Sequence, residues 1–186
     1  MKIAASSLRP NALIDYQGRL WRISKVDHVK PGKGGAFAQV EMKDIEIGTK
    51  LNERFRAEDK VDEVELEMRK LTYSYDEGAA LVFMDSETFE QISVPRDFLE
   101  QQIGYLLPNT EVQAKLYNER LIFIELPANV VLEVVEADAV IKGQSANSSY
   151  KPAKLETGIS VLVPPFVGVG DRIKINTGSG EYVERG

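Results

Sequence analysis

The stretch AFAQVEMKDI, residues 36–45, alternates between apolar and polar side chains almost without a break. Successive side chains of a β-strand point to opposite faces of its sheet, so the alternation predicts a half-buried strand. One face carries Ala36, Ala38, Val40 and Met42, and the other carries Phe37, Gln39, Glu41 and Lys43. Short runs rich in Val, Ile, Leu, Tyr and Phe recur along the chain, separated by Gly, Asn, Asp or Pro. The sequence therefore predicts a mainly β protein packed as small barrels.

A second pattern lies upstream, ALIDYQGRLWRISKVDHV at residues 12–29, and predicts two strands with a turn at Gln17 and Gly18. Between it and the stretch 36–45 stands PGKGG, residues 31–35. Proline cannot donate to a strand ladder, and glycine accepts the positive φ of a tight turn. We therefore expect a hairpin that displays Lys33 at its tip.

Downstream, apolar runs bounded by turn residues predict further strands. They cover residues 64–85 (two strands around an Asp-Glu-Gly turn), 111–117, 120–126, 130–138, 158–164, 171–178 and 181–186. VPRDFLEQQIGYLL, residues 94–107, is the best candidate for a helix, with Pro95 near its first turn and Gly104 near its end. KGQSANSSYKPAKLETG, residues 142–158, is expected to be an exposed loop because it has few apolar residues to bury.

The composition excludes several classes of protein. The 186 residues contain no cysteine and a single histidine, so disulfides, thiolate metal sites and multi-histidine zinc sites are not expected. No long apolar run or signal-peptide pattern is found, which predicts a cytosolic protein without a membrane span. We expect no metal and no cofactor.

Charge is distributed unevenly along a chain whose net charge is −6. Residues 1–63 carry 12 basic and 10 acidic side chains, residues 64–126 carry 5 and 12, and residues 127–186 carry 6 and 7. Together with Pro127, this shift predicts three domains with boundaries near residues 63 and 126. The basic excess of the first forty residues makes the N-terminal domain the expected polyanion-facing end.

Lys33 can be interpreted in three ways. A nucleotide-binding P-loop is disfavoured because no Ser or Thr follows the lysine and a strand rather than a helix comes next. A hairpin tip with one solvated lysine is the ordinary alternative. The third interpretation is that the restricted Pro31 and the glycines present an isolated cation for insertion into a narrow anionic cavity.

Other polar and aromatic residues do not form a recognisable catalytic group. His28 has no Ser-His-Asp partners, so we expect a surface or supporting residue rather than a base. Carboxylate-rich runs look like solvated faces. Trp21 and most other aromatic residues have strand spacing typical of core packing. Tyr182, near Arg185 at the C-terminus, is the candidate exception.

Two segments resemble the bacterial elongation factor P family: KPGKGGAF at residues 30–37 and KPAKLETGISVLVPPFVGVGD at residues 151–171. The second meets the family pattern K-x-A-x4-G-x2-[LIV]-x-V-P-x2-[LIV]-x2-G at Lys151, Ala153, Gly158, Val161, Val163, Pro164, Val167 and Gly170. FMDSETFEQI, residues 83–92, and SGEYVER, residues 179–185, extend the resemblance over the whole chain.

The resemblance implies an SH3-like (KOW-like) domain at 1–63 and OB-fold domains at 64–126 and 127–186, arranged as an L that imitates tRNA. It also implies a monomeric, non-enzymatic translation factor that binds the ribosome between the peptidyl-tRNA and exit sites. There it would relieve stalling at consecutive prolines by positioning peptidyl-tRNA. Lys33 would be the probe of the peptidyl-transferase centre, and a modifying enzyme such as a β-lysyl ligase would extend it.

The resemblance also identifies candidate contacts to tRNA and the ribosome. The tip residues Lys30, Pro31, Gly32, Gly34 and Gly35 would support Lys33, with His28 at the base of the loop. Tyr182 and Arg185 match a C-terminal pair suited to tRNA contact, and GQSANSS, residues 143–149, would face the exit-site codon. In the better-known members of the family this loop reads GDTAGT, whereas here Gln144 stands in place of the aspartate and Asn147 in place of a glycine. Gln144, Ser145 and Asn147 are therefore candidate contacts whose codon preference the resemblance leaves open.

Two rival functions remain open at this point. The first is an elongation-factor-P-like paralogue that acts on other stalls. The second is a free single-stranded nucleic-acid-binding protein, which would need aromatic platforms flanked by basic grooves. The acidic middle third counts against the second rival, and an enzyme ranks below both for want of a catalytic cluster.

Overall fold

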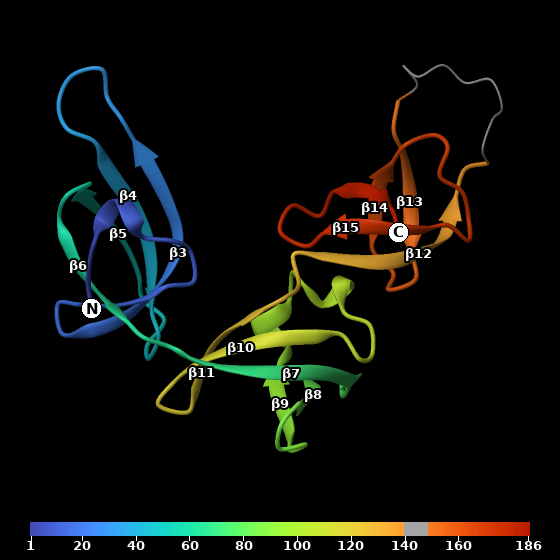
Figure 1. The fold of residues 1–186 in the computed structure, drawn as a ribbon, viewed down its shortest axis with the longest axis horizontal. Helices are drawn as coiled ribbons and strands as arrows, with labels where there is room; N and C mark the ends of the chain where they lie inside the picture. Colours follow the sequence, from blue (N-terminus) through green and yellow to red (C-terminus); the bar gives the residue numbers. More distant parts are fainter. Residues whose placement is uncertain (140–148) are drawn as a thin grey trace. The chain divides into compact units, whose positions relative to one another are not determined.

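The computed structural model describes residues 1–139 and 149–186. In this part of the chain the regular structure consists of β-strands and three short 3-10 helices, which confirms the mainly β prediction. The strands form three sheets that follow one another along the sequence (Figure 1). No helix in residues 1–139 and 149–186 is long and apolar enough to cross a membrane.

The first sheet has six strands in the order β1-β6-β2-β3-β4-β5. They are β1 Lys2–Ala4, β2 Leu13–Tyr16, β3 Arg19–Val29, β4 Phe37–Asp44, β5 Lys50–Arg56 and β6 Lys60–Val64, with the 3-10 helix η1 Ala5–Ser7 after β1. The alternation predicted for β4 is confirmed, because Ala38, Val40 and Met42 are buried in the core. Trp21 is also buried, and its Nε1 donates to the Tyr16 carbonyl oxygen (3.0 Å).

The second sheet has five strands in the order β11-β10-β7-β8-β9. They are β7 Glu67–Asp76, β8 Ala80–Asp85, β9 Gln91–Pro95, β10 Glu111–Tyr117 and β11 Arg120–Glu125. The predicted helix over residues 94–107 is wrong: the segment forms two short 3-10 helices, η2 Arg96–Leu99 and η3 Ile103–Tyr105. Pro95 pairs with Ala80 as the last residue of β9, and Phe98 is 41% exposed, so the apolar residues do not form one buried helical stripe.

The third sheet has five strands in the order β14-β13-β12-β15-β16. They are β12 Asn129–Ala137, β13 Lys151–Leu155, β14 Ser160–Val163, β15 Arg172–Asn176 and β16 Tyr182–Arg185. The expectation of one exposed loop over residues 142–158 is wrong for its second half, which forms β13. Ala153 and Leu155 supply a short alternation that is buried, and two apolar residues were too few to indicate a strand from sequence.

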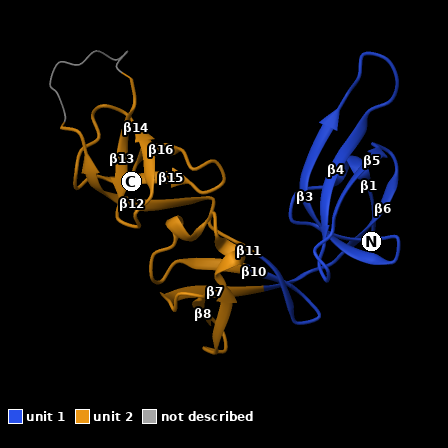
Figure 2. Cartoon of the chain, turned by 180° about the vertical axis from the view of Figure 1, so that it is seen from behind, with its two compact units in different colours: residues 1–68, 114–123 blue, residues 69–113, 124–186 orange. Residues whose placement is uncertain are grey.

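The chain forms two compact units (Figure 2). One comprises residues 1–68 and 114–123, and the other comprises residues 69–113 and 124–186. Within the first unit, the Arg22 guanidinium lies 5.6 Å from the centroid of the Phe123 ring, and Arg120 donates to the Ile45 carbonyl oxygen. The three-domain division at residues 63 and 126 stays a prediction.

Candidate functional site

The long antiparallel pair β3–β4 carries the predicted tip. Its last two pairs are His28 with Ala38 and Val29 with Phe37, and residues 30–36 connect the strands. The connection extends as a loop beyond the paired strands (Figure 1). At its base, the Ala57 N–H donates to the Ala36 carbonyl oxygen (3.0 Å), which ties the loop to the residues after β5. The sequence therefore located this hairpin correctly.

Lys33 is exposed at the middle of this loop, and Lys30 is exposed at its start. Among the residues that the structure describes, neither lysine forms an ion pair with a carboxylate. An unpaired ammonium on a long flexible stem remains free to contact an external anion.

The three glycines of the loop have different structural requirements. Gly34 has a φ of +98°, which side-chain-bearing residues rarely adopt. Gly32 and Gly35 do not have a positive φ, and a Cβ at either position would find no atom within 4 Å. Only Gly34 is therefore required by the loop's own backbone conformation, while Gly32 and Gly35 keep the space around Lys33 open.

His28 is exposed, and its pairing with Ala38 places both side chains on the same face of the sheet. Across residues 1–139 and 149–186, no group of three or more His, Cys, Asp or Glu residues could hold a metal ion. The pairing places His28 at the base of the Lys33 loop, and its role in supporting contacts there stays a prediction.

A cavity of about 540 Å³ lies beside the loop. Its lining residues come from the end of the loop, the start of β4, the end of β5 and the turn after β5: Gly35, Ala36, Phe37, Arg54, Arg56, Glu58 and Asp59. The Arg54 guanidinium stacks over the Phe37 ring, 4.2 Å from its centroid. This site was not predicted from the sequence, although the order Arg-Phe-Arg at residues 54–56 places both arginines on one strand face.

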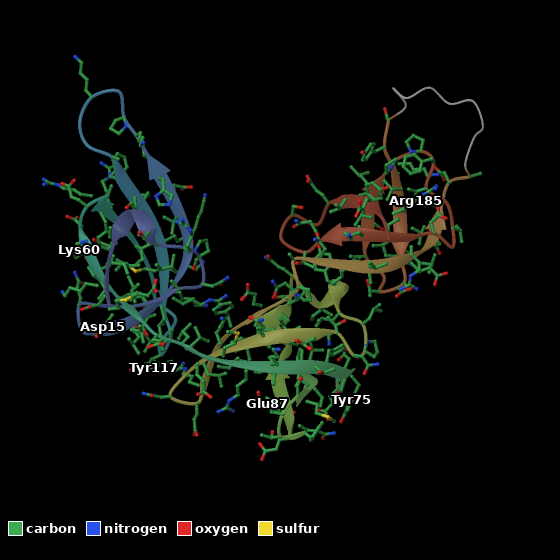
Figure 3. All side chains as sticks on the ribbon, viewed as in Figure 1. Asp15, Lys60, Tyr75, Glu87, Tyr117 and Arg185 are labelled. Carbon is green, nitrogen blue, oxygen red and sulfur yellow. The ribbon has the colours of Figure 1, made fainter. Side chains whose placement is uncertain are left out.

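The C-terminal candidates lie on β16, and Figure 3 labels Arg185. Arg185 Nη2 donates to the Phe166 carbonyl oxygen (3.1 Å), and its guanidinium lies 4.7 Å from the centroid of the Phe166 ring. Arg185 also forms an ion pair with Asp171 (3.6 Å). These contacts hold the guanidinium in one orientation while 56% of its side-chain surface stays exposed.

Tyr182 is half-buried and packs against the core of the third sheet. Burial raises the pKa of its hydroxyl, and the nearby positive charge of Arg185 opposes this rise. The structure therefore places Tyr182 close to Arg185, but part of the Tyr182 ring packs against the core of the third sheet. Phe166, which stacks on Arg185, was not singled out from sequence because its 50% exposure depends on the fold.

Three other predicted contacts, Gln144, Ser145 and Asn147, lie outside the described residues. Their assignment to the ribosome or to tRNA stays a prediction.

Comparisons with known proteins match the whole chain. The models of the elongation factor P (EF-P) KOW-like domain, the EF-P OB domain and the elongation factor P C-terminal region match residues 4–61, 66–124 and 130–185. Elongation factor P of Acidithiobacillus ferrooxidans is 54% identical over 185 residues, with 100% of each chain covered. That of Nitrosospira multiformis is also 54% identical over 185 residues, covering 99% of this chain and 98% of its own.

A more distant relative, elongation factor P of Zymomonas mobilis, is 46% identical over 185 residues and covers 100% of this chain and 99% of its own. Among solved structures, eukaryotic translation initiation factor 5A from Methanococcus jannaschii is 23% identical with a TM-score of 0.43, covering 68% of this chain and 92% of that chain.

Proposed function

The chain belongs to the bacterial elongation factor P family of translation elongation factors, and on this premise we propose that it acts on ribosomes stalled at consecutive prolines. It binds in the cytoplasm, as a monomer, between the peptidyl-tRNA and exit sites. The observation that carries the proposal is the unpaired, exposed Lys33 in the glycine-rich loop of the β3–β4 hairpin.

Proline explains why such a factor is needed. Its ring fixes φ, and its nitrogen is a secondary amine, so a nascent chain that ends in prolines is held away from the geometry of attack. A factor that orients the peptidyl-tRNA lowers the entropic cost of alignment. The ribosome performs the chemistry, and this protein acts by positioning rather than as an enzyme.

In this proposal Lys33 contacts the backbone of the tRNA acceptor end. Its ammonium provides donors for phosphate or hydroxyl oxygens, and the open surroundings of Gly32 and Gly35 allow the RNA to approach closely. Lys30 and Pro31 support the loop, and His28 lies at its base.

A modifying enzyme, with a β-lysyl ligase as the first candidate, extends Lys33 in the cell. The exposure of the loop supports this proposal, because the enzyme must enclose the ε-amino group. An adduct with its own amino groups lengthens the side chain and adds hydrogen-bond donors.

Tyr182 and Arg185 provide a second contact to tRNA. The support for this role is that Arg185 is held by Phe166 and Asp171 yet keeps half of its surface exposed. Gln144, Ser145 and Asn147 are proposed to face the exit-site codon, as the family resemblance implies.

The main alternative is a paralogous role at stalls without prolines, and the intact PGKGG at residues 31–35 favours the proline role. A purified translation system with a message for three consecutive prolines tests the proposal. We expect the protein to reduce the fraction of ribosomes halted at the prolines, Lys33→Ala to lose this effect, and modified Lys33 to increase it.

Lys50→Ala is the matched control, since it removes one exposed positive charge from the end of the β4–β5 pair that lies away from the Lys33 loop. If Lys33→Ala relieves the halt as well as the unaltered protein does, the proposed role of Lys33 is wrong. Relief of a proline-free stall with no effect on prolines would favour the paralogous function.

A further inference from the structure

The cavity beside the Lys33 loop has no part in the function proposed above, yet its size is that of a ligand site. Its volume of about 540 Å³ falls within the range of small-molecule pockets, about 300–1,000 Å³. Its walls combine one aromatic ring, two guanidinium groups and two carboxylates. This combination restricts the chemistry of a ligand that could fit.

The positive charge in the cavity comes from β5. Arg54 and Arg56 alternate with the buried Phe55, so both side chains leave the same outer face of the strand. Within the described ranges, neither arginine forms an ion pair with a carboxylate. Guanidinium groups bind phosphate through paired N–H donors, so two arginines without an ion pair on one wall favour a phosphorylated ligand.

The flat surface in the cavity is formed by Phe37 and Arg54. Phe37 is half-buried, and the guanidinium lies 4.2 Å from the ring centroid. Unpaired nucleobases stack on aromatic rings and on the planes of guanidinium groups. The stacked pair therefore offers a surface for a planar heterocycle next to the phosphate-binding groups.

The carboxylates determine which phosphorylated ligands are disfavoured. Asp59 accepts a hydrogen bond from the Arg56 backbone N–H (2.9 Å), which holds it in the turn after β5, and Glu58 is exposed on the same wall. Both repel a bare phosphate ion. A carboxylate can, however, accept hydrogen bonds from an exocyclic amine or a ribose hydroxyl. The lining thus favours a ligand that carries a phosphate and such donors together.

We propose that this cavity binds one unpaired nucleotide of an RNA strand, with its phosphate at Arg54 and Arg56 and its base on the Phe37–Arg54 surface. Glu58 receives hydrogen bonds from the base or the ribose. Gly35 belongs both to the loop and to the cavity wall, so the bound nucleotide lies directly beside the loop that carries Lys33. The assignment of the nucleotide to an RNA strand rests on the proposed function. The preference of the cavity for a nucleotide rests on its lining residues.

The test uses the full-length unmodified protein labelled for NMR. Probes are adenosine 5′-monophosphate, adenosine, ribose 5-phosphate, inorganic phosphate and a 5′-phosphorylated CCA trinucleotide. We expect saturable shifts at the amides of Gly35, Ala36 and Asp59, with the monophosphate binding about tenfold tighter than adenosine or ribose 5-phosphate. The trinucleotide should bind tighter still. Equal affinity for trinucleotide and monophosphate would overturn the RNA assignment.

Variants separate the two halves of the cavity. Arg56→Ala should weaken monophosphate binding about tenfold, whereas Phe37→Leu should reduce it to the affinity for ribose 5-phosphate. Lys50→Ala is the matched control, because Lys50 is exposed on the same face of β5 but does not line the cavity. Equal weakening by Lys50→Ala and Arg56→Ala would mean that only the general charge attracts the nucleotide, which overturns the site.

The proposed function can fail independently of this inference. Nucleotide binding in the cavity together with a Lys33→Ala variant that still relieves proline stalls would contradict the proposed function alone. The loss of relief in Lys33→Ala, combined with no nucleotide shifts at Gly35, Ala36 and Asp59, would contradict the cavity assignment alone.

Discussion

The glycines of the Lys33 loop are not equivalent. Gly34→Ala places a side chain at a φ of +98° and should destabilise the native loop, whereas Gly32→Ala enters open space without a positive φ. We expect Gly32→Ala to leave the thermal unfolding temperature unchanged or slightly raised. It should still reduce relief of proline stalls, because the added methyl group obstructs the approach of RNA to Lys33.

Unfolding temperatures and stall relief measured on both variants test this distinction. If Gly32→Ala relieves stalls as well as the unaltered protein does, the open space beside Lys33 has no functional role.

Asp44 and Asp85 are buried carboxylates in two similar turns. Hydrogen bonds from the backbone N–H groups of Glu46 and Ile47 lower the pKa of the Asp44 carboxyl group. In the same way, hydrogen bonds from the backbone N–H groups of Thr88 and Glu87 lower the pKa of Asp85. Their unfolded pKa is about 3.9. Because the folded values lie below it, the unfolded chain binds more protons, so this stabilisation is lost as pH falls from about 5 through the folded pKa.

We therefore expect the free energy of unfolding to fall less steeply between about pH 5 and pH 3 in Asp44→Asn than in the unaltered protein, since the amide does not titrate there. Its oxygen can still accept the two backbone hydrogen bonds. Urea unfolding at several pH values measures the effect. An identical pH slope in both proteins would show that Asp44 does not contribute.

At the scale of elements, η3 packs against the turn between β13 and β14 within the second compact unit. A Cβ at Gly104 would overlap the Ile159 side chain, and Thr157 Oγ1 donates to the Gly104 carbonyl oxygen (2.5 Å). Tyr105 and Leu107 pack against the core of the third sheet. Gly104 is therefore a site of close packing rather than the end of a helix.

Gly104→Ala should lower the free energy of unfolding by about 1–3 kcal/mol, because the Ile159 side chain must move. The double variant with Ile159→Ala should cost less than the sum of the two single variants, since the smaller side chain removes the overlap. Denaturant unfolding of the three variants gives the coupling. Strict additivity would contradict the proposed packing role.

The elements found from sequence are those whose signal is local. The β4 alternation and the glycine-rich turn at residues 31–35 identified the β3–β4 hairpin because strand period and turn chemistry need no distant contacts. Strand β13 was missed because its buried side is short. The helix predicted over residues 94–107 was wrong because Gly104 packs against Ile159, which lies 55 residues away in the sequence. The cavity depends on the register of β4 with β5, in which Phe37 pairs with Arg56.

At the scale of the whole molecule, the uneven charge predicts selective rather than general RNA binding. Residues 64–126 carry 5 basic and 12 acidic side chains and should repel RNA that is not presented in the correct shape. We expect weak binding to naked single-stranded RNA at physiological salt and much tighter binding to ribosomes that hold peptidyl-tRNA. Filter binding with both targets measures this. Comparable affinities would favour the free nucleic-acid-binding alternative.

The most direct measurement is the single-turnover rate of peptide-bond formation between a peptidyl-tRNA ending in two prolines and prolyl-tRNA. It is made with no factor, with this protein and with Lys33→Ala, each protein before and after modification of Lys33. We predict that the unaltered protein accelerates the step, that modification increases the effect, and that Lys33→Ala gives the rate without factor. Equal rates in all reactions would contradict the claim that Lys33 positions peptidyl-tRNA for proline addition.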